Sequence, residues 1–362
     1  MRRLLPAAVA LALLGLAAYV VLRPSPAPPA TASAPPRTGE TPQGGPRVTT
    51  KTGPGVVAVT PVAPQRPKGE LVIHGKWGSG PGEFGHRDAK ESNPEAPMAI
   101  AAGPSGQLAI VDQVNGRVQR FDHGKPAGTI SLGGETAQDL TFGADGRTIV
   151  LDRLGDRNVQ VYDRDGKLVN EASFVGREIS EGGNATGVFT DEAGAIYVER
   201  EHGNLYRVAD AGGRTDPSHA ELPGRPTRDG RQLIAAALGD QAAGTVVVNA
   251  FDRGSGSPIW SATVPVGAPI QSLLLLDSDA AGSIYVAAST GQESPSPPFQ
   301  IVDEAVVVMR LDPSGTPNGR LVLPPLAQVA ETFRPLSVDD SGAVYEMVAG
   351  PNGLDVMRFA FQ

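Results

Sequence analysis

The sequence contains no cysteine. This absence excludes disulfide bonds, a thiol nucleophile, zinc sites built on thiolates and lipid attachment through a cysteine. It also means that the chain, if it is exported, needs no oxidative step to fold. A helix-favouring composition is absent as well, because 45 glycines and 33 prolines among 362 residues indicate a chain with many turns.

The sequence has no excess of positive charge. Its formal net charge is -8, and a surface this acidic repels the phosphate backbone of nucleic acids. We therefore expect no nucleic-acid partner.

Motifs of nucleophilic catalysis and of phosphate binding are also missing. There is no G-x-S-x-G elbow. The glycine-rich segment 78–85 is not followed by the Lys-Ser/Thr pair of a phosphate-binding loop. The sequence thus predicts no catalytic residues, no cofactor-binding residues and no cofactor.

The N-terminus carries a long apolar run. Arg2 and Arg3 precede Leu4–Leu22, which contains no charged residue. The run is longer than the core of about 7–15 residues in a cleaved signal and close to the about 20 needed to span a bilayer. We expect residues 1–23 to be a single membrane anchor that leaves the rest of the chain on the periplasmic or extracellular side. The alternative is a signal peptide cleaved near residues 30–34 (ATASA), which would give a secreted protein.

Residues 24–68 are rich in proline, alanine, threonine and glycine and show no apolar periodicity. Such a segment cannot bury a core, so we expect a disordered linker. It would act as a stalk between the anchor and a folded domain at 69–362; an unimportant disordered tail is the alternative.

A repeated pattern begins after the linker: an apolar strand, a turn that ends in glycine, and a second apolar strand. Asp, Asn or Ser before glycine supplies the backbone that a tight hairpin needs. The hinge glycines are Gly106, Gly146, Gly194, Gly244, Gly282 and Gly342. Units of about 40–50 residues with four short strands are typical of propeller blades. We predict an all-β, six-bladed β-propeller; the wide gap before Gly342 leaves room for part of a seventh blade.

The ring has a predicted closure. Glu70–Gly75 is a strand without a partner in its own unit, and the last unit, which ends at Gln362, lacks a fourth strand. If the first strand completes the final blade, no sheet edge is left open at the junction.

Residues 76–122 resemble an NHL repeat, whose pattern runs G-x-G-x-G-x-F, a strand, D-x-x-G, a strand ending in Asp, N-x-R-V/I-Q and F-D. The matching residues are Gly80, Gly82, Phe84, Gly106, Asp112, Asn115, Arg117, Val118, Gln119, Phe121 and Asp122. The second unit keeps Asp152, Asn158, Val159, Gln160, Tyr162 and Asp163, and later units keep only the periodicity. The resemblance implies a propeller, often a binding scaffold, although some NHL-type propellers are enzymes with a divalent metal in the channel.

The turns after the second strand of each unit share one face of the predicted ring, and the long insertions gather there. Loops on a rigid scaffold are the usual place for recognition. We expect this face to bind a protein or a glycan, with these candidate residues: Asp152, Arg153, Glu199, Arg200, His202, Gln292 and Glu293. A solvated rim of scattered ion pairs is the alternative. Trp260 is expected to pack in the core.

The five histidines bear on the alternative function, a metal-dependent lyase or hydrolase with its site in the channel. None of them occupies an equivalent position in two units, so the repeat assembles no ring of ligands. A catalytic metal needs three converging ligands. We predict no metal site, and a non-enzymatic, membrane-tethered binding scaffold as the function.

Overall fold

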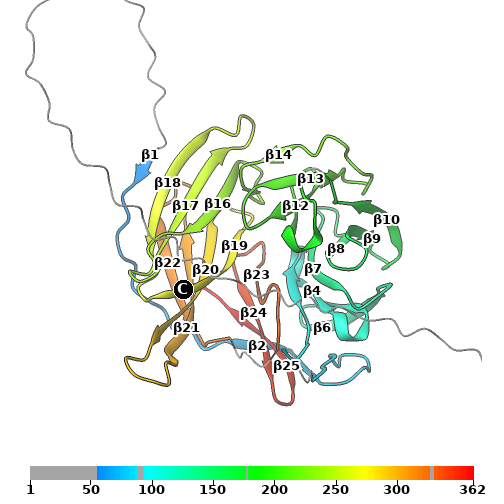
Figure 1. The fold of residues 1–362 in the computed structure, drawn as a ribbon, viewed down its shortest axis with the longest axis horizontal. Coiled ribbons are helices and arrows are strands. Elements are labelled where there is room, and N and C mark those ends of the chain that lie inside the picture. The colour runs from blue at the N-terminus through cyan, green and yellow to red at the C-terminus, as the bar shows by residue number, and fades with distance from the viewer. Residues whose placement is uncertain (1–54, 89–92, 177, 327–329) are drawn as a thin grey trace, which may run out of the picture. The chain divides into compact units, whose positions relative to one another are not determined.

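The computed structural model describes residues 55–88, 93–176, 178–326 and 330–362. Within these residues the strands form six sheets, of four or five strands each, arranged around a central axis (Figure 1). This part of the chain is an all-β, six-bladed β-propeller, as the sequence predicts. The described residues contain no seventh sheet.

We name the blades A to F in chain order. The strands of blades A, B and C, from the innermost outward, are β3 (Ala99–Ala102), β4 (Gln107–Asp112), β5 (Arg117–Asp122) and β6 (Lys125–Ser131) in A; β7 (Ala137–Phe142), β8 (Thr148–Asp152), β9 (Asn158–Tyr162) and β10 (Leu168–Ser173) in B; β11 (Ala185–Thr190), β12 (Ile196–Arg200), β13 (Leu205–Ala209) and β14 (Glu221–Leu222) in C. Short 3-10 helices lie in the connections at η1 (Pro104–Gly106), η2 (Gln113–Asn115) and η3 (Gly182–Asn184).

Blades D, E and F follow the same order with two additions from the N-terminal side. The strands are β15 (Arg225–Pro226), β16 (Gln232–Leu238), β17 (Thr245–Asp252), β18 (Pro258–Pro265) and β1 (Gly55–Val57) in D; β19 (Ile270–Ser278), β20 (Ile284–Glu293), β21 (Ile301–Leu311) and β22 (Pro317–Leu323) in E; β23 (Leu336–Val338), β24 (Val344–Gly350), β25 (Gly353–Phe359) and β2 (Glu70–Lys76) in F.

The predicted closure is confirmed in blade F. Strand β2 pairs antiparallel with β25, with Glu70 opposite Arg358 and Ile73 opposite Val356. The first long strand of the domain therefore forms the outer strand of the last blade, and Ile73 is buried between blades F and A. This pairing removes the edge that β25 would otherwise expose.

The hinge glycines need one correction. Five of the six lie in the turn between the first and second strands of a blade, but Gly244 lies between β16 and β17, the second and third strands of blade D. The equivalent glycine of blade D is Gly230, which has a φ of 72°. The sequence pattern missed it because β15 has only two residues, one of them proline, and so carries no apolar strand signature.

An aspartate organises the first turn in blades C, E and F. In blade C, Asp191 Oδ1 accepts the amide N–H groups of Ala193 and Ala195, and Asp191 Oδ2 accepts the hydroxyl of Tyr197 at 3.0 Å. Asp279 with Tyr285 and Asp339 with Tyr345 repeat this arrangement. The sequence motif D-x-x-G-x-I/V-Y thus fixes a turn to the strand that follows it, since Asp oxygens readily accept nearby backbone N–H groups.

The residues that match the NHL pattern in blade A hold the glycine-rich segment in place. Asp112 Oδ1 accepts the N–H of Gly85 at 2.8 Å, and Asp112 Oδ2 accepts Arg117 Nε at 2.8 Å. Arg117 also donates to the carbonyl of Glu83 at 2.6 Å. A Cβ on Gly85 would lie 2.6 Å from Val114 Cβ, so only glycine allows this close approach. Phe84 is fully buried between blades F and A.

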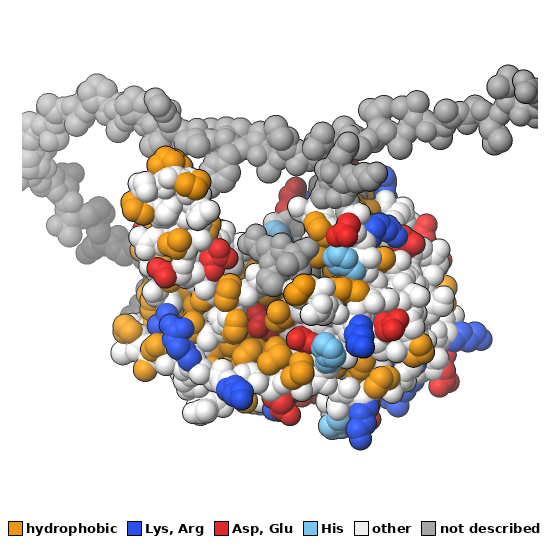
Figure 2. All heavy atoms as spheres, turned by 90° about the horizontal axis from the view of Figure 1, so that it is seen from below, with side chains coloured by type: hydrophobic (Ala, Val, Ile, Leu, Met, Phe, Trp, Pro, Cys, Tyr) orange, Lys and Arg blue, Asp and Glu red, His pale blue; other side chains and the backbone are white. Residues whose placement is uncertain are grey.

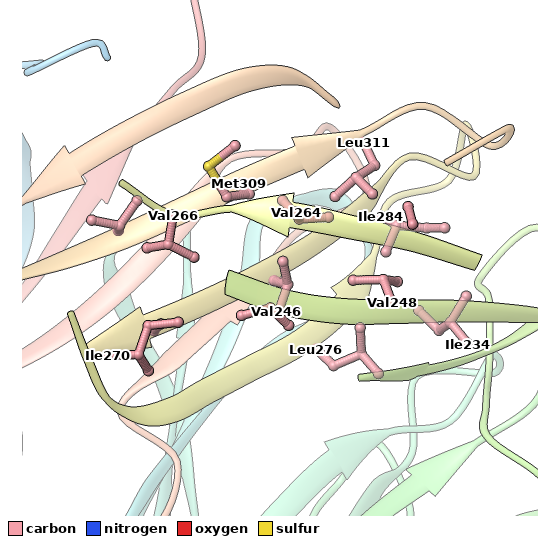
Figure 3. Close-up of a cluster of buried hydrophobic side chains, with 14 of the residues drawn as sticks. Ile234, Val246, Val248, Val264, Val266, Ile270, Leu276, Ile284, Met309 and Leu311 are labelled. Atoms are coloured by element: carbon pink, nitrogen blue, oxygen red, sulfur yellow. The ribbon is translucent and has the colours of Figure 1, made fainter. Parts of the chain in front are cut away.

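Hydrophobic side chains fill the seams between neighbouring blades. Figure 3 shows the cluster between blades D and E, where aliphatic side chains from β16 to β21 point toward one another. Trp260 belongs to this cluster and is 5% exposed, which confirms its predicted place in the core. Buried aliphatic surface of this kind is the main favourable term in folding.

The described end of the predicted linker contacts the propeller. Strand β1 pairs in parallel with β18 at the outer edge of blade D, and Gln65 bridges to Leu321 on the outer strand of blade E. Residues 55–68 therefore follow the rim of the ring. The predicted anchor at 1–23 and residues 24–54 of the predicted linker lie outside the described residues. In the part of the chain that the structure describes, no helix is long and apolar enough to cross a membrane.

Candidate functional site

The central channel contains a cavity of about 840 Å³. Its walls come from the inner strands of the blades, from β16 of blade D and from the connection between blades E and F. A cavity of this volume is within the usual range of small-molecule sites, about 300–1,000 Å³. The channel is therefore the first of two candidate sites.

Three arginines cross-link the blades around this cavity. Arg225 of blade D donates Nε and Nη2 to the Glu199 carboxylate of blade C, at 2.9 and 3.1 Å, and Nη1 to the carbonyl of Leu276 in blade E at 2.6 Å. Arg228 pairs with Asp277 at 3.3 Å and with Asp340 at 3.0 Å, which connects blade D to blades E and F.

Arg334 reaches from the connection before blade F to blades B and C. It donates to the Asp139 carboxylate at 2.5 Å and to the carbonyl of Val188 at 3.3 Å. The ring of Phe189 lies between two of these guanidinium groups, with Arg225 at 4.2 Å and Arg334 at 4.8 Å from its centroid. Such cation–π contacts add to the ion pairs, so the channel lining is firmly cross-linked.

The two buried carboxylates of this network have opposite pKa shifts. Burial alone would raise the pKa of Glu199, but the charge of Arg225 and hydrogen bonds from His202, Arg225 and Thr186 hold that pKa at about 2. Burial raises the pKa of Asp139, although Arg334 and the Val188 amide oppose the shift. One oxygen of Asp139 has no hydrogen-bond partner, which agrees with this direction.

Four of the seven predicted site residues are engaged inside the molecule. Asp152 is buried and accepts the Thr136 hydroxyl and the Gly155 amide, while Glu199 is paired with Arg225. The guanidinium of Arg153 lies over Phe333, and that of Arg200 lies over Tyr206.

The other three predicted residues, His202, Gln292 and Glu293, are exposed. His202 lies 3.7 Å from the Glu199 carboxylate. Gln292 and Glu293 belong to a hairpin in blade E, so the seven residues do not form one cluster.

That hairpin is the second candidate site. The sequence predicts a loop at Thr290–Phe299. Instead, β20 extends to Glu293 and β21 begins at Ile301, so that the two strands pair beyond the other strands of blade E. The pair of strands extends at the lower left of Figure 1, and Figure 2 shows it projecting from the body with hydrophobic side chains at its tip. Phe299 is 61% exposed, and Ile301 and Val302 are about 40% exposed.

The base of the hairpin is acidic. Asp303 and Glu304, which follow Val302 toward the blade, are exposed, and so is Glu293, which lies opposite Ile301. Within the described residues none of these three carboxylates forms an ion pair. The sequence does hold part of the signal for this element, since Ile301 and Val302 are strand-forming residues that precede the apolar run 305–309, although Asp303 and Glu304 lie between them. An apolar tip above unpaired carboxylates has no evident role in packing the blade.

Each histidine of the described residues lies near a single carboxylate rather than in a cluster: His74 near Asp355, His86 near Asp88, His123 near Asp122, His202 near Glu199 and His219 near Glu178. Within residues 55–88, 93–176, 178–326 and 330–362, no group of three or more His, Asp or Glu side chains could hold a metal ion.

Comparison with known proteins assigns the chain to no family. No protein-family model matches the chain, and no curated protein matches it. Among solved structures, hydrazine synthase of Kuenenia stuttgartiensis is 15% identical, with a TM-score of 0.48 over 71% of this chain and 76% of that one. BamB of Moraxella catarrhalis is 12% identical, with a TM-score of 0.42 over 82% and 99%. The WD40 β-propeller domain of Doa1 is 11% identical, with a TM-score of 0.41 over 75% and 84%.

Proposed function

We propose that this protein is a non-enzymatic binding scaffold of the NHL type, held on the outer side of a cytoplasmic membrane by its N-terminal segment. The hairpin formed by β20 and β21 engages a protein partner. One observation carries the proposal: Phe299, Ile301 and Val302 are exposed together at the tip of a paired-strand hairpin, beside exposed carboxylates. Exposed apolar surface next to polar residues is typical of interaction sites.

The chemistry of the hairpin indicates the kind of partner. The apolar tip fits a hydrophobic pocket, and the acidic base favours lysine or arginine around that pocket, because complementary charge orients an encounter and excludes other partners. A protein surface supplies both features. The membrane location is supported by the apolar run Leu4–Leu22.

The test is capture of the partner in the native membrane. A photo-crosslinking residue at Gln300, beside the tip, is expected to yield one dominant adduct, which mass spectrometry then identifies. Phe299→Ser is expected to abolish the adduct. The matched control is Val169→Ser, which changes a residue that is 46% exposed on blade B and should leave the adduct intact.

Two results would contradict the proposal. An adduct that persists in Phe299→Ser places binding elsewhere, and an adduct that consists of carbohydrate makes the ligand a glycan. Stoichiometric, chelator-sensitive metal binding by the purified full chain would favour the alternative, a metal-dependent lyase or hydrolase.

A further inference from the structure

The innermost strand of blade D is shorter than its counterparts. Strand β15 pairs with β16 only at Ile234 and Leu233, whereas β3 of blade A pairs with β4 at four positions. Strand β16 continues to Leu238 beside β17. Its last residues therefore have no inner strand in front of them, and Ala236, Ala237 and Leu238 line the channel cavity.

The facing wall is also apolar. Strands β16 and β19 are neighbours across the seam between blades D and E, and Ala236 and Leu273 pack against the same buried cluster. Leu273 and Leu274 line the cavity from the β19 side. We name this part of the channel the apolar recess: Ala236, Ala237, Leu238, Leu273 and Leu274.

The apolar recess leaves hydrophobic surface open in the channel. Leu238 is 40% exposed, and Ala237 is also exposed. Water in contact with such surface is released favourably when an apolar molecule takes its place. The recess follows from the two-residue length of β15, which pairs with β16 only at Leu233 and Ile234.

Charge on the cavity wall argues against an ionic ligand. The acidic side chains that line the cavity pair with arginines: Glu199 with Arg225, Asp277 and Asp340 with Arg228, and Asp191 and Glu192 with Arg253. Arg334 pairs with Asp139. A charged ligand would have to break one of these pairs and leave its partner without compensation, which is costly in a confined site.

We propose that the apolar recess binds an uncharged, mainly apolar small molecule. The cavity of about 840 Å³ has room for a molecule with one or two rings or an alkyl chain of similar size. The site is independent of the hairpin, since its residues come from β16 and β19 inside the channel.

The absence of cysteine allows a site-specific test on the full chain. Ala237→Cys places a single thiol in the apolar recess, and Ala127→Cys places one on an exposed position of β6 at the outside of blade A. Each thiol is reacted with N-phenylmaleimide and with N-(4-carboxyphenyl)maleimide, which differ only in a carboxylate. Intact-mass spectrometry measures the two rates.

The expected result is a preference for the uncharged reagent that is about tenfold larger at position 237 than at position 127, because prior binding in the recess raises the local concentration. The preference should be lost in the double variant Ala237→Cys/Leu273→Trp, which fills the recess. N-phenyl-1-naphthylamine should slow labelling at position 237 and leave position 127 unaffected.

Equal preferences at the two positions would overturn the proposal, and so would faster reaction of the carboxylated reagent at position 237. Circular dichroism checks that each variant folds. If Ala237→Cys does not fold, Leu238→Cys gives the same comparison from the adjacent position.

Discussion

The seam between blades D and E is filled by hydrophobic side chains, whereas the seam between blades C and D is filled largely by ion pairs. Buried residues from seven strands form the first cluster. In the second, the apolar cluster among the described residues has only three buried members, Ala195, Tyr197 and Leu205, with the partly buried Phe189 and Leu222 packed against them. Arg225 and Arg253 of blade D face carboxylates of blade C in the same region.

The short strand β15 accounts for this difference. It brings Arg225 to a place where other blades supply an apolar inner strand. A buried ion pair gains little net stability once the loss of hydration is counted, whereas apolar burial gains about 25 cal/mol per Å². We therefore expect the ring to open at the seam between C and D before it opens elsewhere.

The largest effect is expected at the seam between D and E. Trp260→Ala removes a buried ring and the hydrogen bond from its Nε1 to the Pro313 carbonyl at 3.2 Å. The free energy of unfolding should fall by about 3–5 kcal/mol. Chemical denaturation measures the loss. Ile259→Ala, at a neighbour that is 41% exposed, is the control; an equal loss there would refute the assignment of Trp260 to the core.

Replacing a buried carboxylate in an apolar seam should increase the stability of the protein, whereas Trp260→Ala decreases it. Glu346 is fully buried on the same side of β24 as Val344, its two oxygens have no hydrogen-bond partner, and burial raises its pKa to about 8. Because the folded state binds this proton more tightly than the unfolded state, stability falls as the pH rises from about 4.5 to 8.

Glu346→Gln removes this loss. The variant should be more stable than the native protein by about 3 kcal/mol at pH 7 and equal to it near pH 4.5. Denaturation curves across this pH range provide the measurement, with the exposed Glu293→Gln as the control. A difference that does not depend on pH would show that Glu346 is ionised in the folded protein.

Arg225→Ala tests the polar seam itself. Because Glu199 is left buried without its cation, a loss of about 2–3 kcal/mol is expected at pH 7. Hydrogen exchange should rise first in β11 and β16. Arg231→Ala, where the side chain is 77% exposed, is the control and should change little.

The ion pair of Arg225 and Glu199 also makes the stability of the protein depend on pH in a defined way. The pKa of Glu199 is about 2 in the folded state, so its contribution is present above about pH 4.5 and is lost as the pH falls toward 2. Arg225→Ala should lack this acid-sensitive part of the stability curve. If the variant lost stability between pH 4.5 and 2 as the native protein does, another carboxylate would be responsible for that loss.

The smallest changes in stability are expected for two buried tyrosines, which can be compared with each other. Asp279 Oδ2 accepts only the Tyr285 hydroxyl, so Tyr285→Phe should cost about 1–2 kcal/mol. Asp191 Oδ2 keeps Arg253 at 2.8 Å after Tyr197→Phe, so that variant should cost only about 0.5 kcal/mol. Thermal unfolding of the two variants provides the comparison, and the reverse order would contradict the local role of Arg253.

The sequence predicted what depends on neighbouring residues. The Asp-Gly turns, the alternating apolar strands and the closing strand Glu70–Gly75 all follow from local chemistry, and the structure confirms them. Apart from that closure, it did not predict side-chain contacts between distant residues. Arg334 and Asp139 are 195 positions apart, and nothing near either residue indicates the other.

The candidate sites were predictable only in part. The hairpin follows the second strand of blade E, where the sequence predicts a long insertion, but Asp152 and Glu199 look like any surface carboxylate in the sequence and are in fact buried. Strand β15 was missed for a related reason: Arg225 and Pro226 show no strand pattern, and their pairing depends on the rest of the ring.

The joining of β2 to β25 also has a consequence for biosynthesis. Strand β2 is made early but has no place to pair until β25 has been synthesised, so blade F is completed only after the strands of the other five blades have been made. Until then an open edge and apolar surface stay accessible, and both make a nascent chain prone to aggregation. A premature stop codon that removed only β25 would leave β2 without its partner strand and the ring of blades without its closure.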